Sequence, residues 1–139
     1  MIIISHRGNI NGPNTLENHP DQIKSVLNLG FDCEVDLWVE ENSFILGHDK
    51  PQYEIDCNFL RQPGLWIHCK NFSSLQSLPN ELNYFWHQED DFTLTSKGYI
   101  WTYPQKKTGY KSIIVDNDKN WASKKHNCFG VCTDWITLK

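Results

Sequence analysis

The sequence predicts a single domain of the α/β class, and three observations support this prediction. The chain has 139 residues, which is the size of one domain. Several short apolar runs have the length and the β-branched or aromatic content of buried strands. Stretches with helical spacing of apolar residues lie between some of these runs, and such alternation is typical of a parallel sheet covered by helices.

Short apolar runs are the candidate strands. Residues 2–5 are a β-branched run, and residues 31–39 read Phe-Asp-Cys-Glu-Val-Asp-Leu-Trp-Val. A turn at Glu41-Asn42-Ser43 separates this second run from residues 44–47. The remaining runs are residues 65–69, 84–87, 99–102, 113–115 and 129–132. Roughly seven or eight strands are therefore expected.

Helix signals are fewer than strand signals. Residues 20–29 carry Ile23, Val26 and Leu27 at helical spacing, and Gly30 is suited to end this helix. Residues 73–78 and 118–125 are expected to form two more short helices, and residues 55–60 a single helical turn. A complete (β/α)₈ barrel takes about 250 residues, whereas 139 residues leave about 17 for each of eight units. If the sheet closes into a barrel, several helices must therefore be shortened or missing.

Composition and charge argue against several classes of protein. The formal net charge of −4 and the pI of about 5.8 disfavour binding of nucleic acid through counterion release. No run approaches the roughly 20 apolar residues of a transmembrane helix, and the first residues lack the pattern of a signal peptide. We therefore expect a cytoplasmic protein without a membrane anchor. Its five cysteines are expected to be reduced thiols, and the spacing of Cys128 and Cys132 does not favour a zinc site.

Glu34 and Asp36 are the first candidates for a functional site. On a strand, residues i and i+2 point to the same face, so the two carboxylates would lie side by side. If both were buried, they would repel each other unless a divalent cation lay between them, because hard cations bind carboxylate oxygens. The alternative is a strand with one face in solvent, on which the two groups hold no ligand.

Two histidines lie just past the ends of apolar runs, and each is followed by a charged residue. His6 precedes Arg7, and His48 precedes Asp49. Parallel α/β folds place their active sites at such strand ends, and histidine exchanges protons near neutral pH. The planar guanidinium of Arg7 suits a phosphate group. These positions predict a phosphate site with two proton-transfer groups.

Other residues near strand ends allow two interpretations each. Lys70 shares a strand face with His68, where it can attract an anionic ligand or simply reach solvent. His87 and Asp134 also end apolar runs and can support the site or the structure alone. Five further residues can form an apolar or sugar-stacking wall or the core of a small barrel: Phe85, Trp86, Trp101, Tyr103 and Pro104.

The order and spacing of four segments point to a known family. The segments are His6-Arg7-Gly8, Glu17-Asn18, Glu34-Val35-Asp36 and His48-Asp49. This set resembles the glycerophosphodiester phosphodiesterases, which belong to the phospholipase-C-like phosphodiesterases with TIM-barrel folds. Residues 66–70 and 130–134 resemble two later strands of that family, one reading Glu-x-Lys and the other ending in Thr-Asp. The resemblance implies an α/β fold over residues 1–139, a reduced TIM-type (β/α) barrel with several helices shortened or missing.

The resemblance also implies roles for individual residues. Two histidines match the family's catalytic pair: His6 and His48. Two carboxylates match its metal ligands: Glu34 and Asp36. Three residues match contacts to the phosphate or the substrate: Arg7, Glu17 and Lys70.

Two departures from the family pattern affect these expectations. His68 stands where the family has a third carboxylate ligand, and we expect it to be the third ligand here. A histidine ligand shifts the preference from Ca²⁺ towards Mg²⁺, Mn²⁺ or a transition metal. The expected cofactor is one divalent ion, Mg²⁺ or Ca²⁺, with Mn²⁺ as a further candidate. The chain is also much shorter than typical relatives, so their substrate does not carry over directly.

The expected function is metal-dependent cleavage of a small, glycerophosphodiester-like phosphodiester. In the implied scheme, one histidine deprotonates the attacking hydroxyl and the other protonates the leaving oxygen. Two alternatives remain open: a binding module for a phosphorylated ligand on the same fold, and a lyase that releases a cyclic phosphate. The expected partner is the small-molecule phosphodiester substrate, with no nucleic acid and no membrane anchor. Sheet faces left uncovered by missing helices also predict a homodimer.

Overall fold

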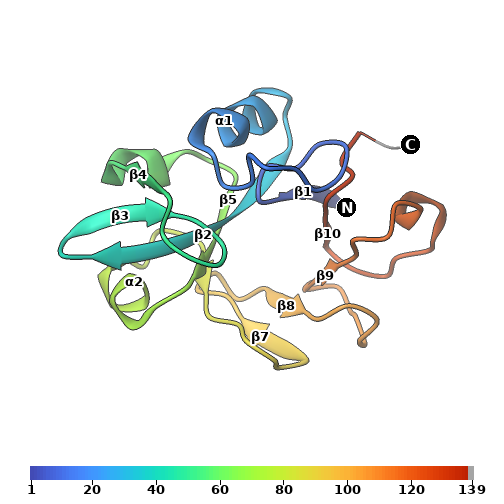
Figure 1. The fold of residues 1–139 in the computed structure, drawn as a ribbon. Coiled ribbons are helices and arrows are strands. Elements are labelled where there is room, and N and C mark those ends of the chain that lie inside the picture. The colour runs from blue at the N-terminus through green and yellow to red at the C-terminus, as the bar shows by residue number, and fades with distance from the viewer. Residues whose placement is uncertain (138–139) are drawn as a thin grey trace.

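A curled, mixed β-sheet forms the body of the protein in a computed structural model that describes residues 1–137 (Figure 1). Seven strands pair in parallel with at least one neighbour: β1 (Ile2–His6), β2 (Asp32–Glu40), β5 (Leu65–Cys69), β6 (Tyr84–Phe85), β8 (Ile100–Thr102), β9 (Ser112–Val115) and β10 (Gly130–Thr133). Three more strands pair antiparallel: β3 (Ser43–Leu46), β4 (Tyr53–Ile55) and β7 (Phe92–Leu94). The helical elements are α1 (Pro20–Asn28), α2 (Phe72–Ser77) and the short 3₁₀ turns η1 (Cys57–Arg61) and η2 (Trp121–Ser123).

The long strand β2 connects two parts of the sheet. Its first residues pair with β1 on one edge, and its opposite edge pairs with β5 from Cys33 to Leu37. Beyond the end of β1, the last residues of β2 pair with β3, which continues into β4. On the other side of β1 the order is β10, β9, β8 and β7. The parallel strands thus follow one another in chain order around the curl.

The prediction of a reduced TIM-type α/β barrel is wrong. The protein is mostly β, its sheet is mixed and curls into a half-barrel, and residues 1–137 contain only two α-helices, of nine and six residues. Residues 118–125 illustrate the reason, because the expected helix is reduced to the three-residue η2. Asp116 Oδ1 accepts a hydrogen bond from the N–H of Asp118, and Asp118 Oδ1 accepts one from the N–H of Asn120. Such local bonds compete with helix formation.

Other local predictions agree with the structure. Helix α1 has Pro20 at its start, buries Ile23 and Val26, and is followed by Gly30 with a φ of 91°. A positive φ is the conformation that favours glycine at the end of a helix. The expected turn at residues 55–60 corresponds to η1. The eight expected runs all contain strands, whereas β4 and β7 were not predicted.

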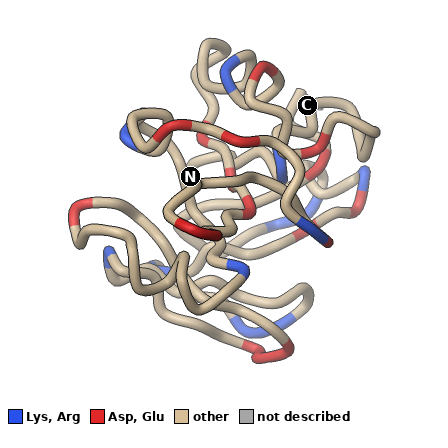
Figure 2. The backbone as a smooth tube through the Cα atoms, turned by 60° about the vertical axis from the view of Figure 1, so that its left-hand side comes forward, with Lys and Arg blue, Asp and Glu red and all other residues tan. Residues whose placement is uncertain are grey.

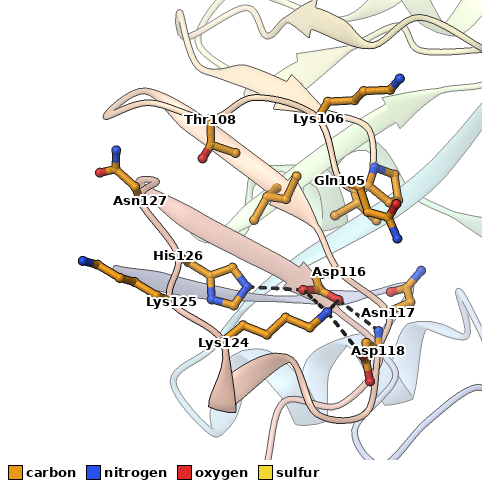
Figure 3. Close-up of a pocket in the computed structure, with 13 residues that line it drawn as sticks. Gln105, Lys106, Thr108, Asp116, Asn117, Asp118, Lys124, Lys125, His126 and Asn127 are labelled. Atoms are coloured by element: carbon orange, nitrogen blue, oxygen red, sulfur yellow. Dashed lines mark hydrogen bonds and ion pairs between the residues drawn. The ribbon is translucent and has the colours of Figure 1, made fainter.

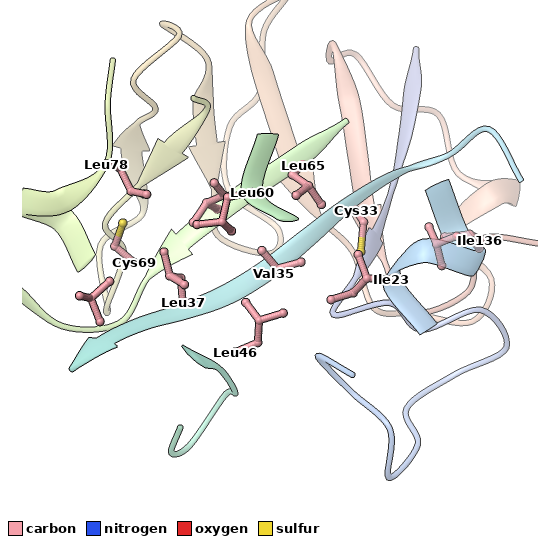
Figure 4. Packing of buried hydrophobic residues seen from close by; sticks show 13 residues of the cluster. Ile23, Cys33, Val35, Leu37, Leu46, Leu60, Leu65, Cys69, Leu78 and Ile136 are labelled. Atoms are coloured by element: carbon pink, nitrogen blue, oxygen red, sulfur yellow. The ribbon is translucent and has the colours of Figure 1, made fainter. Parts of the chain in front are cut away.

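Alternation along β2 separates the outer core from the inner face of the curl. Cys33, Val35 and Leu37 are buried in the outer cluster with side chains from α1, β3 and β5 (Figure 4). The inner cluster joins six strands: Ile4, Trp66, Phe85, Trp101, Ile113 and Cys132. Since the outer cluster holds every second residue of β2, Glu34 and Asp36 lie on the inner side, where both are buried.

Two further findings concern the cysteines and the length and hydropathy of the helices. All five cysteines are free thiols, and Cys33, Cys69 and Cys132 are buried. Within residues 1–137, no helix is both long enough and apolar enough to cross a membrane.

Candidate active site

A cavity of about 430 Å³ lies where the parallel strands end. The carboxyl ends of parallel strands meet at one edge of a sheet, so residues far apart in the chain converge there. Six of the eight predicted site residues line this cavity: His6, Arg7, Glu34, His48, His68 and Lys70. Sequence reasoning did not assign a site role to Gln88, Val115 and Asn117, which also line it.

Glu34, Asp36 and His68 form a group, here called the Glu34 cluster, whose ligand atoms all lie within 4.8 Å of one another. Pairing of β2 with β5 places Asp36 directly opposite His68. The Nδ1 atom of His68 is 3.1 Å from Asp36 Oδ1 and 3.7 Å from Glu34 Oε2. Two carboxylates and one imidazole thus converge, and Glu34 and His68 of this group line the cavity.

The orientation of the His68 ring favours a bound cation. Its Nε2 atom donates a hydrogen bond to the backbone carbonyl of His87 at 2.9 Å. In the neutral ring this leaves the lone pair of Nδ1 facing Glu34 and Asp36. A carbonyl that accepts the second ring N–H is the usual arrangement for a histidine that binds a metal.

The two carboxylates also have atoms without hydrogen-bond partners. Glu34 Oε1 and Asp36 Oδ1 are buried and accept no aligned hydrogen bond within residues 1–137. Burial by itself lowers the pKa of His68, but the contacts with Asp36 and Glu34 outweigh it and raise that pKa to about 9. A positive charge is therefore favoured at this point. Carboxylate oxygens and an imidazole nitrogen together suit a divalent cation, so these three residues fit the expected metal ion.

Asn18 holds Asp36 in place, a role that the sequence did not reveal. Its side-chain amide donates to Asp36 Oδ2 at 2.9 Å, and its Oδ1 accepts from the Asp36 backbone N–H at 2.9 Å. Asn18 is buried and has a φ of 66°, a conformation that asparagine adopts more readily than most residues. These contacts, together with His68 and Arg7, lower the pKa of Asp36 although its burial acts in the opposite direction.

His6 is oriented by a second carboxylate. Its Nδ1 atom lies 2.9 Å from Asp134 Oδ1, and its Nε2 atom lies 4.0 Å from Glu34 Oε1. Asn9 donates to the same Asp134 oxygen at 2.8 Å and to Glu17 at 2.6 Å. Burial lowers the pKa of His6, but Asp134 and Glu34 raise it above its usual value. Asp134 thus fixes the ring so that Nε2 faces the cavity, the orientation that a proton-transfer histidine requires.

Arg7 occupies the sharp turn after β1 with a φ of 58°. Its Nε atom lies 3.4 Å from Asp36 Oδ2, and its Nη1 atom lies 3.4 Å from Glu17 Oε1. The Nε atom is buried without a hydrogen-bond partner among the described residues. Glu17 does not line the cavity: it contacts Arg7 and Asn9 instead. Its place in the structure is therefore behind the site rather than against a substrate.

His48 and Lys70 approach the cavity from the rim. His48 follows β3, and its Nδ1 atom lies 2.8 Å from Asp49 Oδ1. Lys70 follows β5, where its backbone N–H bonds to the carbonyl of Leu37 at 2.8 Å. Both histidines expected to be catalytic therefore border the same space as the Glu34 cluster.

The aromatic residues divide between the wall of the cavity and the core. Trp101, Tyr103 and Pro104 line the cavity. Phe85 stacks between His68 and Trp101, with ring centroids 5.0 Å and 4.4 Å away, and belongs to the inner cluster. Trp86 packs against the outer cluster. Of the five residues expected to form a wall or a core, three therefore border the cavity, and they come from β8 and the residues directly after it.

A second pocket of about 420 Å³ adjoins the cavity and shares Pro104, Val115 and Asn117 with it (Figure 3). At its base lies the Asp116 cluster, which comprises Asp116, Asp118, Lys124 and His126. Lys124 Nζ lies 3.1 Å from Asp116 Oδ2 and 3.1 Å from Asp118 Oδ2, and His126 Nε2 lies 3.3 Å from Asp116 Oδ2. None of the residues predicted for the site lines this pocket.

Comparisons of the chain with protein-family models, with curated proteins and with solved structures find no match.

Proposed function

We propose that the protein is a metal-dependent phosphodiesterase that cleaves a small, glycerophosphodiester-like substrate. The observation that carries this proposal is the position of His6. Its Nδ1 atom is held by Asp134, while its Nε2 atom faces a cavity that also contains the Glu34 cluster, Arg7 and Lys70. A site that only bound phosphate would need the cations but not an oriented proton-transfer group. The motif order described above is a second, independent support.

In this proposal Glu34, Asp36 and His68 hold one divalent ion: Mg²⁺, Ca²⁺ or Mn²⁺. When bound, such an ion withdraws charge from a non-bridging phosphate oxygen as a Lewis acid. The three residues fix its position, and Asn18 keeps Asp36 from turning away. The remaining steps belong to groups of the chain itself.

His6 and His48 are proposed to transfer protons on the two sides of the phosphate. One histidine accepts the proton of the attacking hydroxyl, and the other donates a proton to the leaving oxygen. Asp134 stabilises His6 in its protonated form, since it accepts the hydrogen bond from Nδ1. Arg7 and Lys70 place positive charge where negative charge develops on the phosphate oxygens in the transition state.

The test is turnover of bis(p-nitrophenyl) phosphate and of glycerophosphocholine by the purified protein. After treatment with EDTA, Mg²⁺, Mn²⁺ or Ca²⁺ is added back. We expect activity only with added metal, and a loss of about 10²–10⁴-fold in His6→Ala and in His48→Ala. His126→Ala is the matched control, because its ring also contacts a carboxylate but lies outside the cavity. Near-normal turnover in both cavity variants would contradict the assignment.

The products distinguish the proposed hydrolysis from the two alternatives. Phosphorus NMR of the reaction with glycerophosphocholine separates a hydrolysed monoester from a cyclic phosphate. A cyclic product that accumulates without further hydrolysis would identify a lyase. Binding of the metal by calorimetry, with no turnover of either diester under any ion, would leave two interpretations: a binding module, or an enzyme whose substrate is neither of these diesters.

A further inference from the structure

The outer face of β7 and β8 carries exposed apolar side chains. Both α-helices pack against β2, and α2 also against β5, away from this face (Figure 1). The side chains of Phe92 and Leu94 are 48% and 68% exposed, and that of Tyr110 is 81% exposed. Phe92, Ile100 and Tyr110 line a groove of about 390 Å³. Clustered exposed apolar side chains of this kind mark interaction surfaces.

Lysines line this groove and lie in a turn close to it in the chain. Lys107 and Lys111 line it together with the apolar residues, and Lys97 lies in the turn between β7 and β8. Residues 92–115 contain four lysines and no Asp or Glu, whereas residues 1–90 contain 13 Asp or Glu and five Lys or Arg. Figure 2 shows these charges along the backbone. Acidic residues flank this segment on both sides: Asp91 pairs with Lys106 at 3.5 Å, and Asp116 pairs with Lys124 at 3.1 Å.

We propose that this basic, apolar face, formed by Phe92, Leu94, Ile100, Tyr110, Lys107 and Lys111, binds the surface of an anionic lipid bilayer. Apolar side chains enter the boundary between head groups and acyl chains, while lysines extend to the anionic head groups. The composition favours lipid over nucleic acid. Leu94 is the most protruding aliphatic residue of the face, and it gains nothing from stacking on bases. The segment also has no arginine, the residue best suited to bind nucleic-acid phosphate.

The position of the face relates it to the cavity. Phe92 pairs with Thr102, and the next residue, Tyr103, lines the cavity of the proposed active site. The backbone N–H of Tyr103 bonds to the carbonyl of Asp91 at 2.9 Å, so β7 and the cavity rim are directly joined. A bilayer on this face would lie close to the rim. The lipid-binding proposal nevertheless does not depend on the proposed activity.

The test is cosedimentation of the full chain with vesicles of phosphatidylcholine alone and with vesicles of equal parts phosphatidylcholine and phosphatidylserine. We expect binding only to the mixed vesicles, and weaker binding at high salt. Lys107→Ala combined with Lys111→Ala should weaken binding about tenfold or more, since each lysine near an anionic surface adds to the attraction. Leu94→Asn should weaken binding as well, because its apolar side chain no longer enters the interface.

Matched controls separate this face from the rest of the surface. Lys24→Ala combined with Lys50→Ala removes two exposed lysines elsewhere, and Phe72→Asn removes an aromatic residue that is 74% exposed at the start of α2. We expect normal vesicle binding by these variants and by His6→Ala. Equal loss in the controls, or no binding of the unaltered protein to mixed vesicles, would overturn the proposal. Binding of a single-stranded oligonucleotide that depends on the same lysines, or a dimer sealed through this face, would overturn it too.

Discussion

The Glu34 cluster and the Asp116 cluster contain the same kinds of residue but solve the problem of paired carboxylates differently. Each has two acidic side chains and a histidine, which lie on β2 and β5 in the Glu34 cluster and between β9 and β10 in the Asp116 cluster. In the Asp116 cluster, Lys124 lies 3.1 Å from both carboxylates and offsets part of their charge. In the Glu34 cluster the carboxylates are buried, and two of their oxygens lack hydrogen-bond partners among the described residues.

This difference indicates which of the two clusters would gain from a bound metal ion. Acidic groups that share a lysine are partly neutralised in the free protein, and Asp118 is also half exposed to solvent, so this pair gains little from a cation. Buried acidic groups without a lysine must share the charge of a proton, of an arginine or of a metal ion. The residue types alone do not distinguish the two clusters: burial and the position of one lysine do. Four predictions test this distinction, from the largest expected effect to the smallest.

The largest difference is expected when one carboxylate charge is removed from each cluster in turn. Asp36→Asn takes away a proposed metal ligand, so metal affinity should fall by at least about 100-fold, because even partners of a ligand contribute 10–100-fold. Turnover should be lost with it. Asp116→Asn should leave both unchanged. Titration calorimetry with Mg²⁺ and Mn²⁺ measures the affinities, and equal losses in the two variants would erase the distinction between the clusters.

A smaller effect is expected from the residue that holds Asp36. Asn18→Gly keeps a backbone conformation with positive φ but removes two hydrogen bonds to the buried Asp36. The free energy of unfolding should fall by about 1–3 kcal/mol. Asn42→Gly is the matched control, because Asn42 has a φ of 67° in the exposed turn between β2 and β3. Urea denaturation of both variants should show the loss only for Asn18→Gly.

The third prediction concerns pH. In the metal-free protein the pKa of His68 is raised from about 6.5 to about 9, so the folded state binds a proton that the unfolded chain has released. This stabilisation is complete below pH 6.5 and is lost as the pH rises towards 9. Between these values the free energy of unfolding should fall by on the order of 1–3 kcal/mol. His68→Gln should lack this fall, and unfolding curves of both proteins across the range provide the measurement. The same slope in the variant would assign it to other groups.

The smallest effect is expected from Lys124→Met. The lysine is exposed, and ion pairs in contact with solvent contribute little to stability. The melting curve should therefore hardly change. Calorimetry should also detect no tight binding of Mg²⁺, because water and salt screen the exposed Asp118. Tight binding by this variant would show that loss of the lysine alone creates a metal site.

The sequence predicted the strands better than the architecture. Runs such as residues 65–69 identify strands because buried strands need a compact apolar segment, and that signal is local. The half-barrel architecture depends instead on the structure of the segments that connect the strands. Whether residues 118–125 form a helix is decided by side-chain bonds from Asp116 and Asp118, which compete with the helical pattern. The strand β4 escaped prediction because it forms only as the partner of β3.

The sequence predicted those residues of the candidate site whose side-chain type by itself suggests metal binding or proton transfer. His6, Glu34, Asp36 and His68 are groups that bind metals or transfer protons. Strand alternation placed Glu34 and Asp36 on one face, and the family resemblance added His68 to them. Their supporting residues could not be predicted in the same way. Asn18 contacts Asp36 only because of its backbone conformation, and the carbonyl of His87 carries no signal in the sequence. Glu17 was expected to contact the substrate; in the structure it contacts Arg7 and does not line the cavity.

The pairing of β1 with β10 has a consequence for how the protein folds. It joins the two ends of the described chain, and the contact between His6 and Asp134 spans 128 positions. Closing so long a loop is entropically costly and slows folding. The β2–β3 hairpin and helix α1, which depend on neighbouring residues, can form much earlier. During refolding, the signal of His6 held by Asp134 should therefore appear after most of the secondary structure, which makes the geometry of the proposed active site a late event.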